Sequence, residues 1–270
     1  MAINYSKAIK KSLYFCIQPK RWIPVFLINF VMFLIVYSAF QIGLGGESII
    51  ASGWTLMLTV FFGVLFLGSV LTSIWITGAV VYQSYKEKEF EKSFRISCSR
   101  YSDLFLVLFA TTILSLIAAI FIIIPLIGIL LSSILIVVIY LSFFFVIQEV
   151  IINKKQWVVA IKNSYALFRE NILLLVLLAI ITELISVLIA LPFQIPGALY
   201  SSEMAGSLAS SSNFFGISLF SKFSVVEKIS EPLFFILMII YMIGSSVATV
   251  FSLKIKTEFY LQMKKRFFRL

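Results

Sequence analysis

The stretch ILLLVLLAIITELISVLIAL, residues 172–191, decides the fold of this chain. Only one of its residues, Glu183, is ionisable. An α-helix needs about 20 consecutive apolar residues to cross a hydrocarbon core of about 30 Å. Pro192, which lacks a backbone N–H, follows directly and is expected to end the helix. The stretch therefore predicts a membrane-spanning helix that carries a single acid.

Similar apolar stretches recur along the whole chain. Of its 270 residues, 61% are hydrophobic and 13% are charged, and the mean hydropathy is +1.07. Water-soluble domains are about 25% charged, so lipid must be the main solvent of this chain. We predict an all-α fold, a polytopic bundle of six transmembrane helices in one transmembrane domain over residues 1–270. The expected spans are about 22–41, 54–82, 104–124, 127–147, 172–191 and 233–253, and the expected outside loop is 192–232.

Basic residues predict the orientation of these spans. Of the 22 Lys and Arg residues, 20 lie within residues 7–21, 86–100, 154–169 and 254–269. Basic residues near the ends of spans stay on the cytoplasmic side, so both termini are expected to be cytoplasmic in a cell membrane. The same residues predict contacts with anionic lipid headgroups. A nucleic-acid partner is not expected, because such proteins gather basic residues on a solvated face with stacking aromatic residues.

The polar inventory is too small for common catalytic or metal sites. The chain has no His, and its two Cys residues, Cys16 and Cys98, lie in predicted cytoplasmic segments where disulfides are rare. Zinc and haem would find almost no ligands. Nucleophile, metal and phosphate-binding motifs are also missing. We therefore predict no cofactor, no metal, no catalytic residue and no enzyme activity.

Three predicted cytoplasmic segments have apolar residues at helical spacing opposite polar ones: one near the start of the chain, 90–101 and 157–171. We predict amphipathic helices that lie at the membrane interface; the alternative is ordinary solvated loops. The segments share the pattern small, apolar, basic, any, Ser, at residues 8–12, 93–97 and 160–164. Each precedes an odd-numbered span, which predicts three tandem repeats of an interfacial helix and a helical hairpin.

Polar residues of these segments, with Glu149 near the end of the fourth predicted span, form a first candidate site on the cytoplasmic side. For Glu149 the alternative role is helix capping or pairing with nearby basic residues. This predicted cytoplasmic collar consists of Lys10, Ser12, Arg95, Ser97, Glu149, Lys162, Ser164 and Arg169.

Glu183 marks a second candidate site near the middle of the membrane. Burying an ionisable side chain there costs about 2.5–3.5 kcal/mol on insertion scales, so such residues are usually functional. Because Glu183 shares a helix face with Ala179, Ser186 and Ala190, its carboxyl is expected to face the bundle interior. It would either titrate or bind a substrate, or stay protonated and hydrogen-bonded between helices. The candidate residues of this intramembrane site are Glu183, Ser186, Asn29, Tyr241 and Ser245.

Three short runs suggest a family: VIQEV at 146–150, NKK at 153–155 and AIKNSYALFREN at 160–171. They resemble the membrane domain associated with glycerophosphoryl diester phosphodiesterases and related uncharacterised six-span bacterial and archaeal membrane proteins. The run FYLQMKKR at 259–266 is similar to the final tyrosine and basic tail of that group. In its phosphodiesterase members a separate soluble barrel is catalytic, so the resemblance implies the six-span fold without an active site.

We therefore predict a non-enzymatic multi-pass membrane protein. It is expected to handle lipid or a small amphiphile, or to organise a protein partner or a homo-oligomer. The alternative is a small permease or channel that uses Glu183.

Overall fold

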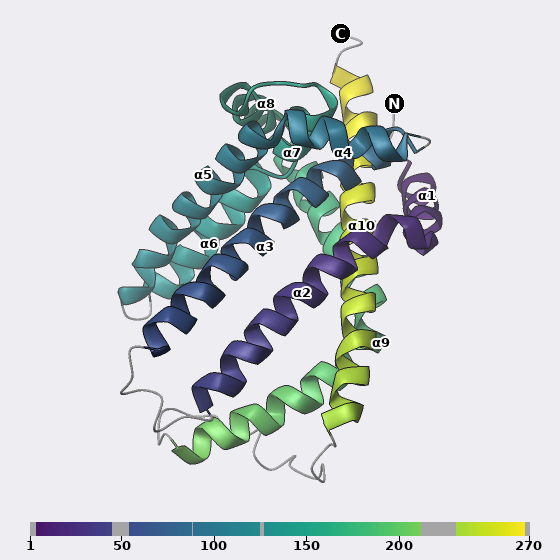
Figure 1. Cartoon of the computed structure of the whole chain (residues 1–270). Helices are drawn as coiled ribbons and strands as arrows, with labels where there is room; N and C mark the ends of the chain where they lie inside the picture. The colour runs from purple at the N-terminus through teal and green to yellow at the C-terminus, as the bar shows by residue number, and fades with distance from the viewer. Residues whose placement is uncertain (1–3, 45–53, 88, 125–126, 212–230, 268–270) are drawn as a thin grey trace.

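The computed structural model describes residues 4–44, 54–87, 89–124, 127–211 and 231–267. These residues form ten α-helices and one short 3-10 helix, with no strand among them (Figure 1). Within the described ranges, six segments are long and apolar enough to cross a membrane, which confirms the predicted fold class. An α-helix is suited to lipid because its backbone N–H and C=O groups form hydrogen bonds with one another within the helix. The six segments are Pro19–Ala39, Val60–Tyr85, Tyr101–Ile123, Ile127–Ile152, Ile172–Phe193 and Phe235–Lys265.

The helices that carry these segments contribute most of the described chain. Their bounds are α2 Pro19–Leu44, α3 Trp54–Tyr85, α5 Tyr101–Ile120, η1 Phe121–Ile123, α6 Ile127–Ser142, α7 Val146–Ile152, α9 Ile172–Ser211 and α10 Glu231–Phe267.

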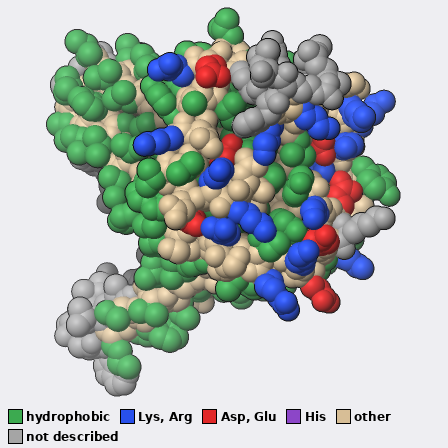
Figure 2. All heavy atoms as spheres, turned by 90° about the horizontal axis from the view of Figure 1, so that it is seen from above, with side chains coloured by type: hydrophobic (Ala, Val, Ile, Leu, Met, Phe, Trp, Pro, Cys, Tyr) green, Lys and Arg blue, Asp and Glu red, His purple; other side chains and the backbone are tan. Residues whose placement is uncertain are grey.

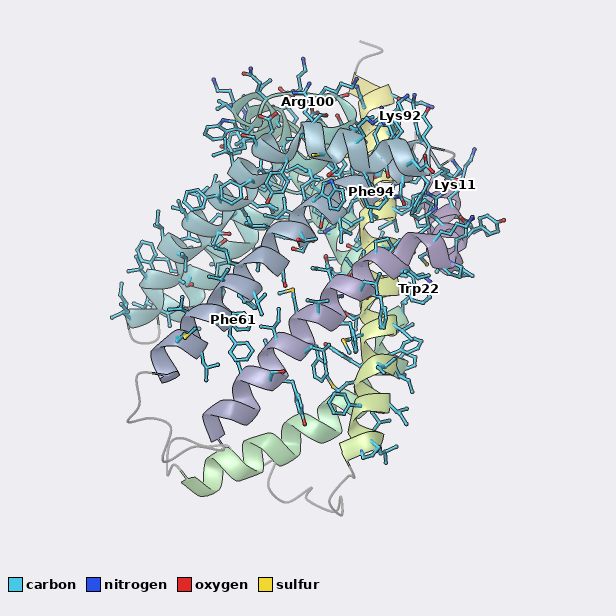
Figure 3. The ribbon with its side chains drawn as sticks, in the orientation of Figure 1. Lys11, Trp22, Phe61, Lys92, Phe94 and Arg100 are labelled. Atoms are coloured by element: carbon cyan, nitrogen blue, oxygen red, sulfur yellow. The ribbon has the colours of Figure 1, made fainter. Side chains whose placement is uncertain are left out.

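Three shorter helices lie at one end of the bundle: α1 (Tyr5–Ile17), α4 (Phe90–Ser99) and α8 (Trp157–Glu170). Both marked chain ends lie at this same end, which we call the charged end (Figure 1). Figure 3 shows Lys11, Lys92 and Arg100 there, and Phe61 far from it on α3. At the start of α1 the Asn4 side chain accepts a hydrogen bond from the Lys7 N–H, an ordinary N-cap.

The fourth predicted span, 127–147, is not one continuous helix. α6 ends at Ser142, a turn follows, and α7 begins at Val146. The Ser164 hydroxyl of α8 donates to the Ser142 carbonyl at 2.7 Å and accepts from the Phe145 N–H at 3.3 Å. A helix break frees backbone groups that must find partners. Here the Ser164 side chain, which belongs to another helix, is the partner of both the Ser142 carbonyl and the Phe145 N–H.

Two predicted helix ends were also wrong. α9 does not end before Pro192 but continues to Ser211, so the first part of the predicted loop is helical. Proline removes a helical N–H and commonly bends a helix. Figure 1 shows the last part of α9 lying across the end of the bundle opposite the charged end. α10 continues past the predicted end at residue 253 to Phe267.

Packing is concentrated near the charged end. Tyr260, Phe15, Phe145 and Phe251 are among the largest fully buried side chains. Farther from this end, Val64–Leu67 of α3 are four consecutive exposed apolar residues. Consecutive residues point about 100° apart, so every side of α3 is partly exposed there. This half of the bundle offers an apolar surface that suits lipid.

The five-residue pattern shared by the three short helices is buried at the same positions in each of them. Its first and last residues are buried in each of them, as Ala8 and Ser12, Ser93 and Ser97, and Ala160 and Ser164. α1 packs against α10, α4 against α3, and α8 against α7. The small residues therefore form the faces by which these helices dock on the bundle.

Candidate functional site

Glu183 does not face the interior of the bundle as predicted. Ala179, Ser186 and Ala190 are buried, but the Glu183 side chain is 53% exposed. Thr182 and Ser186 lie on the buried stripe of α9, and Glu183 is one helical step, about 100°, away from Thr182. Its carboxyl therefore lies at the border between the buried and the exposed face of α9.

Two side chains from other helices contact this carboxyl. The Tyr140 hydroxyl of α6 donates a 2.6 Å hydrogen bond to Glu183 Oε1. Lys256 Nζ of α10 lies 3.6 Å from the same oxygen and donates to the Tyr140 hydroxyl at 3.1 Å. We call these three residues the Glu183 cluster. It joins α6, α9 and α10.

Lys256 also contacts two aromatic rings. Its ammonium lies 5.2 Å from the ring centroid of Tyr140 and 5.0 Å from that of Phe144. The negative ring faces attract a cation, and they do so most strongly where water is scarce. The Lys256 side chain is thus more buried than that of Glu183; the two are 16% and 53% exposed.

The partners predicted for Glu183 lie elsewhere. Asn29 of α2 donates to the Ser246 hydroxyl of α10 at 3.2 Å, so it contacts the neighbour of Ser245. Ser186 donates to the Thr182 carbonyl of its own helix at 2.7 Å. The Ser245 carbonyl accepts from Thr249 at 2.9 Å. Tyr241 of α10 is half-buried. Within the described part of the chain these residues do not form a site around Glu183.

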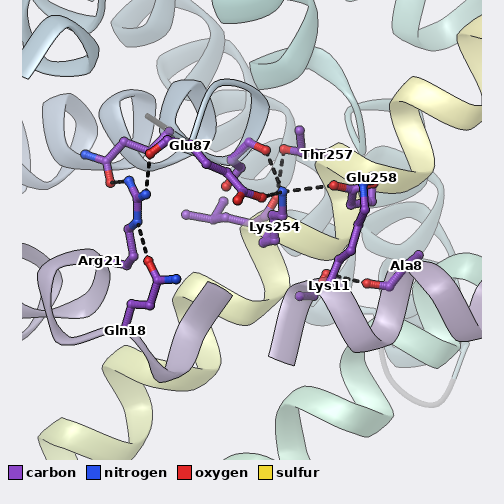
Figure 4. A network of polar contacts seen from close by, with 12 residues as sticks. Ala8, Lys11, Gln18, Arg21, Glu87, Lys254, Thr257 and Glu258 are labelled. Carbon is purple, nitrogen blue, oxygen red and sulfur yellow. Dashed lines mark hydrogen bonds and ion pairs between the residues drawn. The ribbon is translucent and has the colours of Figure 1, made fainter. Parts of the chain in front are cut away.

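A second polar cluster surrounds Lys254 of α10, whose side chain is 1% exposed (Figure 4). Its ammonium donates to the Ser84 carbonyl at 2.7 Å and to Glu87 Oε1 at 2.8 Å. It also lies 2.9 Å from Glu258 Oε1, and Glu258 Oε2 lies 3.6 Å from Lys11 Nζ. A buried cation is tolerated only with such complete pairing. These contacts connect α10 to α1 and to the end of α3.

Arg21 extends this cluster to the start of α2. Its guanidinium donates to Gln83 Oε1 at 3.3 Å and to the Glu87 carbonyl, and it lies 4.8 Å from the ring centroid of Phe15. Burial raises the pKa of Glu87, but Lys254, Arg21 and Lys11 together outweigh burial and hold that pKa below its ordinary value. Glu87 is therefore ionised in the folded protein at neutral pH.

Glu149, predicted as part of the collar, is a buried hydrogen-bond acceptor. Oε1 accepts from the Tyr260 hydroxyl at 2.7 Å, and Oε2 accepts from Asn153 and Asn163 at 2.9 and 3.3 Å. Lys264 contacts Asn153 from α10. Three hydrogen-bond donors therefore offset the cost of burying this carboxyl group. These contacts join α7, α8 and α10.

The other collar residues do not converge on one site. The serines Ser12, Ser97 and Ser164 are buried where the short helices dock. The basic residues are exposed, and Figure 2 shows Lys and Arg side chains scattered over the charged end. The exposed basic members of the collar are Lys10, Arg95, Lys162 and Arg169.

Sequence reasoning missed Tyr140, Lys254 and Lys256. The apolar spacing of Phe251, Ile255 and Phe259 continues through the two lysines and would have extended the sixth span. No such signal existed for Tyr140, because nothing in the sequence places α6 beside Glu183. Within the described ranges, no three His, Cys, Asp or Glu side chains are grouped so as to hold a metal ion.

Residues 94–263 match the domain of unknown function DUF7847, and since this match covers more than half of the chain, the protein belongs to that family. The matched region contains the whole Glu183 cluster and Glu149, whereas Arg21 and Glu87 precede it. No curated protein and no solved structure matches the chain. The family description states no function, so the resemblance to the phosphodiesterase-associated membrane domain stays a prediction.

Proposed function

We propose that this protein is a non-enzymatic multi-pass membrane protein that binds a lipid or another small amphiphile at the Glu183 cluster. The observation that carries the proposal is the 53% exposure of a carboxyl eleven residues into α9. A carboxyl that is exposed within a membrane span is accessible to molecules in the bilayer. Intramembrane ionisable residues are by default candidates for ligand or ion binding.

The surroundings of the cluster suit an apolar chain. Leu184 and Val187 of α9 and Val137 of α6 are exposed and lie within about one turn of Glu183 and Tyr140. A ligand with a polar group and a hydrocarbon chain would contact both kinds of surface. This combination of a few polar groups with apolar walls is typical of small-molecule sites.

We further propose that the charged end is cytoplasmic and rests on anionic headgroups. Tyr14 and Ile17 are exposed apolar residues of α1, and they lie near the exposed Lys10 and Lys20. Such an amphipathic helix binds the membrane interface by apolar insertion and by charge. A protein partner or a second copy of this chain could use the same exposed basic surface.

The three short helices also support the proposal of three tandem units. Ser97 and Ser164 each donate to a carbonyl 22 residues earlier, that of Trp75 or of Ser142. Ser12 instead donates to the Ala8 carbonyl of its own helix, and α1 docks on α10. In the proposed arrangement each short helix packs against an even-numbered span, and the first unit closes on the last.

A mild-detergent preparation analysed by native mass spectrometry tests the amphiphile proposal. We expect the wild type to retain a lipid or metabolite enriched above its share of the bulk extract, and Glu183→Leu to lose that enrichment. Glu170→Leu removes an exposed carboxyl from α8 and is the matched control. A wild-type protein without any enriched molecule would contradict the proposal.

The alternative, a proton-coupled permease, rests on the same carboxyl. It predicts proton-dependent flux in reconstituted vesicles that Glu183→Gln abolishes. Flux of this kind without an enriched amphiphile would favour the permease.

A further inference from the structure

The two oxygens of the Glu183 carboxylate are not equivalent. Tyr140 and Lys256 both contact Oε1, at 2.6 and 3.6 Å. Oε2 accepts no hydrogen bond from the residues that the structure describes. The side chain is 53% exposed on a segment long and apolar enough to cross a membrane, where hydrogen-bond donors are scarce. An unmatched carboxylate oxygen there strongly favours a ligand that brings a donor.

The charge of the cluster restricts that ligand. Lys256 supplies one positive charge against the one negative charge of Glu183, and Tyr140 is neutral as a hydrogen-bond donor. The cluster is therefore already neutral overall. A cationic ligand would leave it with a net positive charge about 16 Å along α9 from Ile172, where an uncompensated charge is unfavourable. An uncharged donor leaves the balance intact.

We infer that the ligand is an uncharged amphiphile whose hydroxyl or amide N–H donates a hydrogen bond to Glu183 Oε2. This inference rests on the proposed function and specifies the chemical class of the ligand. The hydrocarbon chain lies along exposed apolar residues on the side of the cluster away from the charged end. On α9 these residues are Leu184 and Val187, and on α6 they are Ile136 and Val137.

Photo-crosslinking in nanodiscs tests the inference with a matched pair of probes. One probe is a long-chain alcohol that carries a diazirine in its chain, and the other is the methyl ether of the same molecule. Only the alcohol can donate. We expect roughly tenfold more labelling of the peptide around Glu183 by the alcohol, as a hydrogen bond to a charged acceptor would give. In Glu183→Leu the two probes should label equally, whereas Glu170→Leu should keep the difference.

The outcomes separate the two proposals. Equal labelling of the wild type by alcohol and ether, above the level of bulk lipid, would overturn the inference but leave amphiphile binding standing. Stronger labelling by a quaternary ammonium analogue would also overturn it, because the ligand would then be cationic. Labelling by none of the probes above bulk would contradict amphiphile binding itself. The comparison on the wild type holds even if Glu183→Leu does not fold.

Discussion

The Ser97 hydroxyl donates a 2.6 Å hydrogen bond to the Trp75 carbonyl, and it binds there because residue 78 of α3 is a glycine. A Cβ atom on Gly78 would lie 2.3 Å from Ser97 Oγ and 2.6 Å from Leu104 Cδ1. Both distances are far below van der Waals contact. The docking of α4 on α3 therefore depends on a missing side chain.

Gly78→Ala is expected to destabilise the protein by about 1–3 kcal/mol, the usual cost of overpacking a tight contact. Thermal unfolding in detergent measures it. Gly68→Ala in the same helix is the control, because a Cβ there meets nothing within 4 Å. Equal melting temperatures for the two variants would contradict this account of the contact.

Lys254→Met is expected to destabilise the protein by about 3–5 kcal/mol, because removal of one member of a buried ion network leaves its partners uncompensated. Glu258 lies 2.9 Å from Lys254, and in the variant its one remaining ion-pair partner among the described residues is the more distant Lys11, at 3.6 Å. Lys162→Met, an exposed change in α8, should have almost no effect. A similar loss of stability in both variants would mean that the Lys254 contacts contribute little.

The contribution of Glu87 to stability should depend on pH. Its pKa in the folded protein lies below the ordinary 4.5, so its stabilising effect is complete above that value and is lost as the pH falls through the folded pKa. The wild type should therefore melt above Glu87→Gln at pH 7, and the difference should shrink towards pH 3. A difference in melting temperature that is independent of pH would contradict the ionised pair with Lys254.

The two cysteines should differ in reactivity. Cys98 is exposed on α4, whereas Cys16 is buried and burial raises its pKa to about 11. Since the thiolate is the reactive form, a maleimide at pH 7 should modify Cys98 alone. With a membrane-impermeant reagent, labelling is expected only from the cytoplasmic side, and Cys98→Ser should remove it. Labelling of intact cells from outside would reverse the proposed orientation.

The spans could be predicted because lipid imposes length and composition on any helix that crosses it. Interactions between distant residues could not. The break after Ser142 depends on the Ser164 hydroxyl, and the extension of α10 depends on partners that neutralise Lys254. Glu183 was predicted to face the bundle interior, and it lies one helical step, about 100°, from the buried Thr182. That one step places its side chain at the surface instead of in the interior.

α10 contacts α1, at the other end of the sequence, as well as α9, which precedes it. The Asn4 N–H donates to Gln262 at 2.8 Å, and the ring of Tyr5 lies 6.0 Å from that of Phe259. During synthesis α1 leaves the ribosome first among the described helices and α10 last. Glu87 and Arg21 are therefore synthesised long before Lys254, which contacts Glu87 in the folded protein. The polar cluster around Lys254 can form only after α10 has been translated.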